Sequence, residues 1–182
     1  WAKPLLDKLN CYIAICGDYW MDNLMQSEFQ YLKGKSIHLN MGLDRKSYPK
    51  VKFSFNEKGV RKFLYIGRVS KEKNIEMLEK IALQNKNFEG GYIGNGTIKG
   101  WKQIAPKAHF SPSFMKKLAS EYDFFINAST YDAQATTVLE AMSWGFVVAC
   151  TPETGYTEKS IFQLSKDDVE FNLKLVEKLN HL

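Results

Sequence analysis

Two acidic residues flank the start of an expected helix in the stretch TYDAQATTVLEAMSWG (130–145). Asp132 stands just before a helix that we expect to begin around Gln134, and Glu140 follows about two turns inside it. A carboxylate can accept hydrogen bonds from two neighbouring hydroxyls, and the free amides of a helix start attract anions. The spacing therefore suits a ligand with sugar hydroxyls on either side of a phosphate. The alternatives are an ordinary N-cap at Asp132 and an exposed surface position at Glu140.

A second candidate site is the loop GRVSKEKN (67–74), which follows an expected strand. Arg68 comes directly after that strand, and Lys73 lies at the opening of the next helix. A guanidinium binds phosphate oxygens in pairs, an ammonium adds a point charge, and the helix dipole supports both. The two cations therefore suit a diphosphate. The alternative is a solvated basic loop.

The segment GNGTIKG (94–100) imitates a dinucleotide-binding fingerprint. Its spacing is G-x-G-x-x-x-G instead of G-x-G-x-x-G, and no acidic residue ends a strand about 20 positions later. We therefore reject an NAD site. Gly94 and Gly96 instead predict a tight turn, either one that brings backbone close to a ligand or a turn alone.

The elements that must position these residues follow from the hydrophobic pattern. Short apolar runs alternate with amphipathic stretches, which predicts an α/β fold with a parallel sheet. Ligands of such sheets bind at the carboxyl ends of the strands, so the three segments are expected at one edge. The expected strands are 11–16, 35–42, 61–67, 88–94, 107–110, 123–129 and 146–150. The expected helices cover 18–32, the stretch from Ile75 to Ala82, 113–121, the stretch from about Gln134 to Gly145, and a last helix with Ser165 as N-cap.

Composition excludes some classes of protein. The 182 residues are 45% apolar, enough for one substantial core, but no apolar run approaches the roughly 18 residues of a membrane span and no leader opens the chain. We therefore expect a cytoplasmic protein. Its lysines are scattered and its net charge is +5, which fits an anionic ligand, nucleic acid, or peripheral association with the inner face of a membrane, and decides none of them.

The residue types that bind metals form no cluster in the sequence. Cys11, Cys16 and Cys150 lie inside apolar runs, so we expect buried, reduced thiols. His38 and His109 pair with no cysteine and are expected to be packed or surface residues. The sequence therefore predicts no metal site.

In combination, these motifs resemble the nucleotide-binding C-terminal domain of the retaining GT-B glycosyltransferases of family 4. That pattern runs strand, G-R-x-x-x-x-K, helix, strand, G-x-G, helix, strand, E-x7-E, and G-x-P-V-V followed by a G-x-x-E turn. The resemblance covers residues 36–160 well, and its matches are Gly67-Arg68 with Lys73, Gly94 with Gly96, Asp132 with Glu140, FVVAC, and Gly155 with Glu158. Residues 38–49 also resemble the segment that leads into the domain.

The resemblance implies a Rossmann-like doubly wound sheet and a role for each matched residue. Arg68 and Lys73 would neutralise the donor diphosphate, Glu140 would hold the nucleotide ribose, and Asp132 the transferred sugar; these four are the implied catalytic residues. The base would lie near His109, Phe110 and Ser111. The other implied donor-binding positions are Gly67, Gly94, Gly96, Gln134, Ala135 and Thr136. The donor, a UDP- or GDP-linked sugar, is a substrate, and no metal or other cofactor and no nucleic acid is implied.

The sequence departs from the family pattern at the acidic stretch. Asp132 is one methylene shorter than the usual glutamate, and Ala133-Gln134-Ala135 replaces a glycine, aromatic, glycine run. The chain opens at Trp1 with helix-like sequence, so we expect a fragment in which residues 1–34 are a remnant or linker of an N-terminal domain and 35–182 form the donor domain. Such a chain is expected to bind a donor without transferring it, because the acceptor site belongs to the missing domain.

The functional expectation is the donor domain of a retaining hexosyltransferase that modifies a glycan or lipid acceptor in cell-surface polysaccharide biosynthesis. The rival is a non-catalytic GT-B-like module that binds or scaffolds, which the shortened acid and missing glycines also fit. A receiver-like domain would need a strand-end acidic cluster, and the sequence has none.

Overall fold

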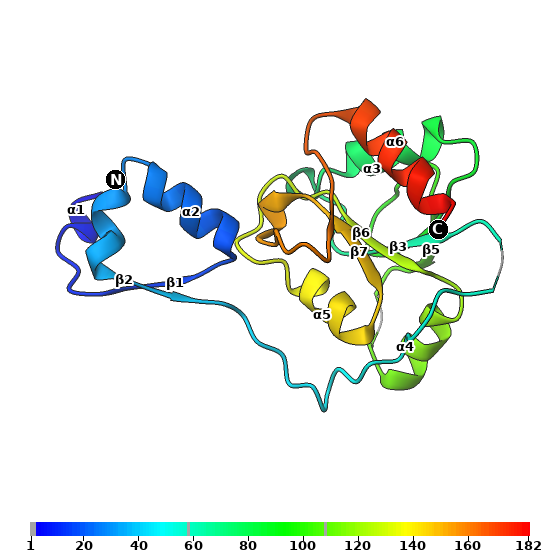
Figure 1. Cartoon of the computed structure of the whole chain (residues 1–182), viewed down its shortest axis with the longest axis horizontal. Coiled ribbons are helices and arrows are strands. Elements are labelled where there is room, and N and C mark those ends of the chain that lie inside the picture. Colours follow the sequence, from blue (N-terminus) through cyan, green and yellow to red (C-terminus); the bar gives the residue numbers. More distant parts are fainter. Residues whose placement is uncertain (1–2, 58, 108) are drawn as a thin grey trace.

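A computed structural model describes residues 3–57, 59–107 and 109–182. Figure 1 shows a small N-terminal lobe joined by an extended linker to a larger domain. The lobe contains α1 (Lys3–Leu6), β1 (Tyr12–Ile15), α2 (Asp18–Gln26), a 3₁₀ helix η1 (Gln30–Lys35) and β2 (Ser36–Leu39). Strands β1 and β2 pair in parallel, so the first sheet extends past residue 34. The linker comprises the residues between β2 and β3.

The larger domain is built on six parallel strands. They are β3 (Lys62–Ile66), β4 (Glu89–Ile93), β5 (Lys102–Ala105), β6 (Phe124–Asn127), β7 (Val147–Cys150) and β8 (Phe162–Gln163). Their order in the sheet is β5-β4-β3-β6-β7-β8. Numbered within the domain, this is 3-2-1-4-5-6, the order of a Rossmann-like doubly wound sheet. The predicted α/β class is therefore confirmed.

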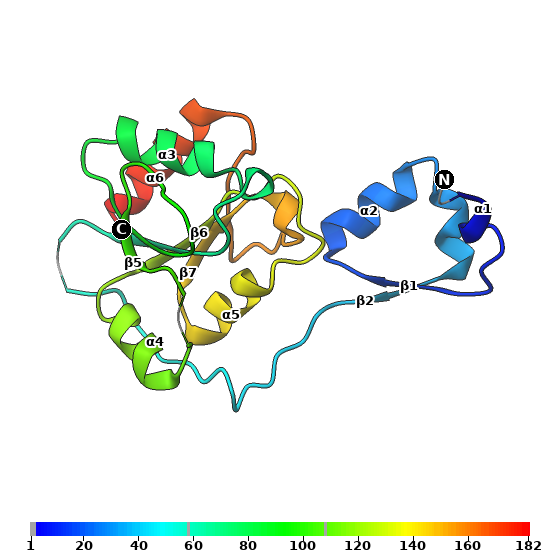
Figure 2. The same ribbon diagram turned by 180° about the vertical axis from the view of Figure 1, so that it is seen from behind.

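Helices cover both faces of this sheet. Helices α3 (Ile75–Gln84) and α6 (Val169–Asn180) pack against each other on one face, and α4 (Pro112–Ala119) and α5 (Thr136–Trp144) cover the other (Figures 1 and 2). Alternation along β3 explains the two layers, because Phe63 and Tyr65 join the core beneath α3 and α6 whereas Leu64 joins the core beneath α4 and α5. Two 3₁₀ turns, η2 (Lys71–Lys73) and η3 (Pro152–Thr154), follow β3 and β7.

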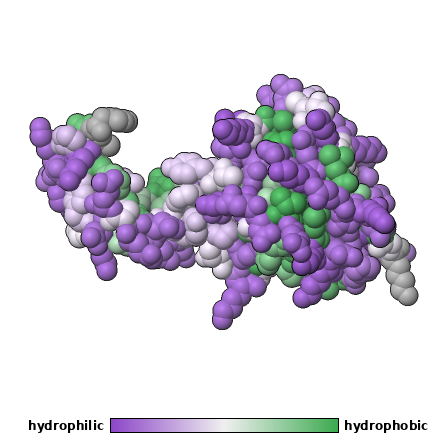
Figure 3. Space-filling model, turned by 90° about the horizontal axis from the view of Figure 1, so that it is seen from above, coloured by the Kyte–Doolittle hydropathy of each residue, from purple (hydrophilic) through white to green (hydrophobic). Residues whose placement is uncertain are grey.

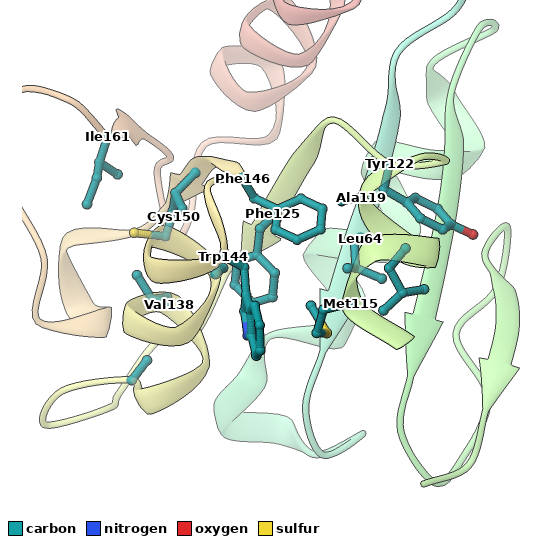
Figure 4. Packing of buried hydrophobic residues seen from close by; sticks show 14 of the residues in the cluster. Leu64, Met115, Ala119, Tyr122, Phe125, Val138, Trp144, Phe146, Cys150 and Ile161 are labelled. Carbon is teal, nitrogen blue, oxygen red and sulfur yellow. The ribbon is translucent and has the colours of Figure 1, made fainter. Parts of the chain in front are cut away.

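The helix that carries Glu140 is fixed by buried side chains. Val138 and Trp144 of α5 are at most 2% exposed and pack with Phe125, Leu64 and Met115 (Figure 4). The helix ends at Gly145, which caps it in the left-handed conformation with a positive φ of 93°. The polar residues of α5 are therefore held by a rigid element.

Four predictions about local structure are wrong. The helix expected over 18–32 ends at Gln26 with α2, and its last residues belong to the 3₁₀ helix η1. The strand expected at 107–110 lies instead at β5, and of the expected range residue 108 is outside the described residues. The N-cap of α6 is Asp168, whose side chain accepts from the Phe171 N–H, while Ser165 Oγ accepts from the amide of Asp168. Cys11 is exposed and Cys16 half-buried, so only Cys150 among the cysteines is a buried thiol.

A buried charge network holds the linker against the domain. Lys52 Nζ lies 2.9 Å from Asp123 Oδ1, and Arg61 lies 3.2 Å from Asp123 Oδ2. The side chains of Lys52 and Asp123 are only 4% and 3% exposed. Further hydrogen bonds support the network, since Lys52 also donates to the Ala119 carbonyl and Asp123 accepts from the amide of Asn56. These contacts fix the linker to Asp123, the residue that precedes β6.

The surface is largely hydrophilic. Figure 3 shows hydrophilic residues over most of the upper face of the molecule, with separate apolar spots. No helix among the described residues has the length and apolar character needed to cross a membrane.

Candidate functional site

The candidate site lies where the strand order reverses. Strands β3 and β6 are neighbours, but the chain leaves them toward opposite sides, so their following loops separate at the carboxyl edge. Residues 67–70 follow β3 and residues 128–135 follow β6. The segments that follow the two strands come into contact, since the Thr130 N–H donates to the carbonyl of Glu72 in η2 over 2.9 Å. The basic and acidic segments predicted from the sequence are therefore brought together.

A cavity of about 810 Å³ opens at this edge beside β3 and β4. Its walls come from the ends of both strands and from the loop that leads into α4. Of the predicted donor-binding residues it is lined by Gly67, Arg68, Gly94 and Phe110. A Cβ atom at Gly94 would overlap the carbonyl oxygen of Gly67, so a glycine is required for the two strand ends to approach this closely.

The cavity lining is cationic. Arg68 and Lys107 line it, and no acidic residue does so among the residues that the structure describes. Arg68 is 78% exposed at its side chain and pairs with Glu72 over 3.1 Å, a contact that solvent weakens. Sequence reasoning missed Lys107, because it placed that residue inside a strand. An open cationic cavity with apolar walls suits an anionic ligand that carries a flat ring.

Lys73 and Asp132 form an ion pair with each other. The Lys73 ammonium donates to Asp132 Oδ2, and the two side chains are 14% and 22% exposed. Lys73 belongs to η2, after β3, and Asp132 follows β6, so the pair spans the point where the strand order reverses. The predicted diphosphate cation and the predicted sugar-binding acid thus neutralise each other in this structure.

The start of α5 offers fewer free amides than we expected. The helix begins at Thr136, and the Ala135 N–H already donates to the Thr154 carbonyl over 2.9 Å. Within the described part of the chain, the N–H groups of Thr136 and Thr137 have no acceptor. These two amides, instead of those of residues 134–136, are the ones that can bind an anion.

Gln134 contacts the linker through its side chain. Its Oε1 accepts from the Met41 N–H over 2.6 Å, and its Nε2 donates to Asn40 Oδ1 over 3.0 Å. The side chain is buried, so the predicted donor-binding role can involve its backbone only. Further contacts tie the same loop to the N-terminal lobe, since the Gly17 N–H donates to the Ala133 carbonyl and the Trp20 indole donates to the Asp132 carbonyl over 2.6 Å.

Glu140 is half-buried on α5 beside a small second cavity. This cavity shares Ile66 and Phe110 with the walls of the larger one, so Glu140 lies close behind the cationic cavity. Burial raises the pKa of its carboxyl above the ordinary value, and a hydrogen bond from Tyr48 partly opposes that rise. Tyr48, on the linker, donates to Glu140 Oε1 over 3.3 Å.

Besides the residues described above, three further predicted donor-binding residues do not line the cavity. Gly96 lies in the turn after β4, where its carbonyl accepts from the Tyr92 hydroxyl. Ser111 is the N-cap of α4 and accepts from the Phe114 N–H. His109 is exposed, and its carbonyl accepts from the Ser111 amide. Of the segment 109–111, only Phe110 reaches the cavity.

The described residues bring together no group of three His, Cys, Asp or Glu side chains that could hold a metal ion. The charges at the site are instead supplied by lysine, arginine and carboxylate side chains.

Comparisons with known proteins establish the fold. No protein-family model matches the sequence, and no curated protein matches it. Among solved structures, a sucrose-phosphate synthase from Thermosynechococcus elongatus has a TM-score of 0.71 at 14% identity over 97% of this chain and 50% of that one. A glycosyltransferase from Rickettsia africae has a TM-score of 0.73 at 12% identity over 97% and 56%. HepE from Anabaena, solved with UDP and glucose, has a TM-score of 0.64 at 13% identity over 93% and 53%.

The neighbours are GT-B glycosyltransferases, and the six-stranded sheet matches their Rossmann-like domains. At this level of identity the likeness concerns the fold. The chain spans about half the length of these solved structures.

Proposed function

We propose that this chain binds a nucleoside diphosphate sugar as the donor domain of a retaining glycosyltransferase of family 4. The observation that carries the proposal is the cationic cavity at the carboxyl edge of β3 and β4, lined by Arg68, Lys107 and Phe110 and bordered by the region of Glu140. A diphosphate fits the two cations, and a base fits the apolar wall at Phe110. HepE, which shares the fold, was solved with UDP and glucose.

In the proposed arrangement, each part of the nucleotide sugar contacts residues of the site described above. The ribose extends toward Glu140, and the diphosphate lies between Arg68 and the free amides of Thr136 and Thr137. Lys73 adds its charge to the same diphosphate when it is released from Asp132, and the transferred sugar then lies near Asp132. Fixed charges and amides stabilise a leaving diphosphate without rearrangement, so the proposed reaction uses no metal ion and no further cofactor.

The experiment that tests donor binding is a calorimetric titration of UDP and of GDP. We expect binding of at least one nucleotide by the wild type and at least about tenfold weaker binding by Arg68→Ala, because a charge-assisted hydrogen bond contributes about 1.5–3 kcal/mol. Arg45→Ala is the matched control, since Arg45 is an exposed arginine on the linker outside the cavity. Failure of the wild type to bind either nucleotide at millimolar concentration would overturn the proposed function.

For the acceptor we propose only a broad chemical class. The parent protein transfers a hexose to a glycan or lipid acceptor. This activity fits the synthesis of a cell-surface polysaccharide. The enzyme would work in the cytoplasm, at or near the inner face of the membrane. The scattered basic residues support contact with an acidic surface. Transfer by the full-length protein to a panel of lipid and glycan acceptors tests this assignment, with the anomeric configuration of the product reporting retention.

A second candidate function is a nucleotide-binding module without transfer. It is favoured by the Lys73–Asp132 pair, in which the cation and the acid needed for transfer neutralise each other, and by the Ala135 N–H, which is occupied by the Thr154 carbonyl. This alternative predicts nucleotide binding with no acceptor-dependent release of UDP or GDP. Acceptor-dependent release by the full-length protein would exclude it.

A further inference from the structure

The linker passes directly over the helix that carries Glu140. The Ser143 hydroxyl donates to the Tyr48 carbonyl over 2.7 Å, and the amides of Val51 and Lys52 donate to the Trp144 carbonyl over 2.9 and 3.0 Å. The Tyr48 ring packs edge-on against the Trp144 indole, with ring centroids 5.5 Å apart. The backbone and the ring of Tyr48 are therefore both held in place on α5.

The Tyr48 hydroxyl is brought onto the Glu140 carboxylate by this packing. It donates to Oε1 over 3.3 Å, and across the described residues Glu140 has no other hydrogen-bond partner and no ion-pair partner. A carboxylate has about four lone-pair positions, so Oε1 keeps one acceptor position and Oε2 keeps both. The carboxylate thus keeps enough acceptor positions for two hydroxyls while the tyrosine remains in place.

We propose that Tyr48 is a positioning residue for Glu140, whose hydroxyl fixes the carboxylate on α5 so that it can accept the two hydroxyls of a nucleotide ribose. This inference rests on the proposed donor-binding function and adds a linker residue to the site. Tyr48 acts through Glu140 and is not itself assigned a contact with the donor.

The surroundings of Glu140 explain why a single hydroxyl matters. The small cavity beside it is lined by apolar residues of β3, β6, α4 and α5 together with Thr137, none of which carries a charge. Tyr156 is another buried titratable group of this region: burial raises the pKa of its hydroxyl, and the charge of Glu140 adds a smaller contribution. Burial raises the pKa of the Glu140 carboxyl, and the Tyr48 hydroxyl is the group that lowers it. Loss of that hydroxyl must therefore raise this pKa further.

The test is a pH titration of the Glu140 carboxyl in the ligand-free chain, followed by NMR with a ¹³C label on the glutamate carboxyls and assigned with Glu140→Gln. Tyr48→Phe keeps the ring on Trp144 and removes only the hydroxyl. We expect it to raise the titration midpoint by about half to one pH unit, the equivalent of one modest hydrogen bond. Tyr122→Phe is the control, because it removes a buried hydroxyl whose charged neighbours are Glu121 and Glu89, and it is expected to leave the Glu140 midpoint unchanged. An unchanged or lowered midpoint in Tyr48→Phe overturns the inference.

Binding of UDP supplies the second measurement. The ionised carboxylate is the form that accepts ribose hydroxyls, so affinity must rise as pH rises through the Glu140 midpoint, and that rise must occur at higher pH in Tyr48→Phe. The phosphate groups of UDP titrate in the same way whether the wild type or Tyr48→Phe is measured. The ratio of the UDP affinities of these two proteins therefore removes the contribution of the phosphates.

A double-mutant cycle separates positioning from general damage. We expect Tyr48→Phe to weaken UDP binding about threefold to fivefold near the midpoint in the wild-type background. In the Glu140→Gln background we expect no further loss. Equal losses in both backgrounds would overturn the positioning role. If the wild type binds neither UDP nor GDP, the proposed function and the ribose role both fail, whereas the carboxyl titration still decides whether Tyr48 holds Glu140.

Discussion

Asp132 and Lys73 were each predicted to contact a different part of a donor, and the folded chain brings them into contact with each other. Sequence patterns identify residue types suited to a ligand. They do not show with which other side chains of the protein those residues form ion pairs. Here each charge has an opposite charge across the junction of the β3 and β6 loops, with little exposure to solvent. Under the proposed function, Asp132 therefore competes with the donor diphosphate for Lys73, in addition to the role proposed for it toward a sugar.

This competition predicts an unusual direction of change. Asp132→Asn removes the negative charge and frees Lys73, so UDP, which lacks the sugar, should bind about threefold to fivefold more tightly. Calorimetry with UDP measures the change, and Asp22→Asn, at an exposed acid on α2, controls for the general loss of one negative charge. Weaker binding of UDP by Asp132→Asn would mean that Asp132 positions Lys73 instead of competing for it.

At the scale of elements, the linker is fixed by charge as well as by packing. Asp123 accepts from both Lys52 and Arg61 in a nearly solvent-free position. Removing one partner of such a network leaves buried charges without compensation. We therefore expect Asp123→Ala to lower the free energy of unfolding by about 3 kcal/mol, measured by urea denaturation.

The control for this prediction is an ion pair of the same charge type at the surface. Lys174 and Glu170 are 2.7 Å apart on α6, with side chains 73% and 77% exposed. Glu170→Ala should leave the free energy of unfolding nearly unchanged, because solvent screens an exposed pair. Similar losses in the two variants would show that burial adds nothing to the Asp123 network.

The sequence predicts a helix or strand well where its hydrophobic pattern is strong. It predicts a strand poorly where only hydrogen bonding to a neighbouring strand defines that strand. The strands around Phe63 and Phe125 are continuous apolar runs, and both were predicted. Strand β5 is Lys-Gln-Ile-Ala, an edge strand with half its residues exposed, so only pairing with β4 identifies it. The contact of Tyr48 with Glu140 was missed for a related reason, since a linker residue 92 positions away leaves no periodic signal.

At the scale of the whole molecule, the two sheets differ greatly in how they are supported. The six-stranded sheet has helices on both faces, and Phe63, Leu64 and Phe125 are completely buried. The lobe has only two paired strands, and its alternate residues Ile13, Ile15, Ile37 and Leu39 lie on one face, each between 47% and 58% exposed. A sheet of two strands is only marginally stable without further burial. The stability of the lobe therefore depends on its contacts with the loop after β6 that contains Asp132.

Hydrogen exchange of the whole chain tests this difference. Amides of β1 and β2 should exchange by local opening at least about a hundredfold faster than those of β3 and β6, which should exchange only through global unfolding. The Gly17 N–H is the informative exception, because it donates to the Ala133 carbonyl beside Asp132. If donor binding stabilises the loop after β6, saturating UDP should slow exchange at Gly17 while leaving Ile13 unchanged. Equal protection of the two sheets would show that the lobe is as stable as the larger domain and needs no support from it.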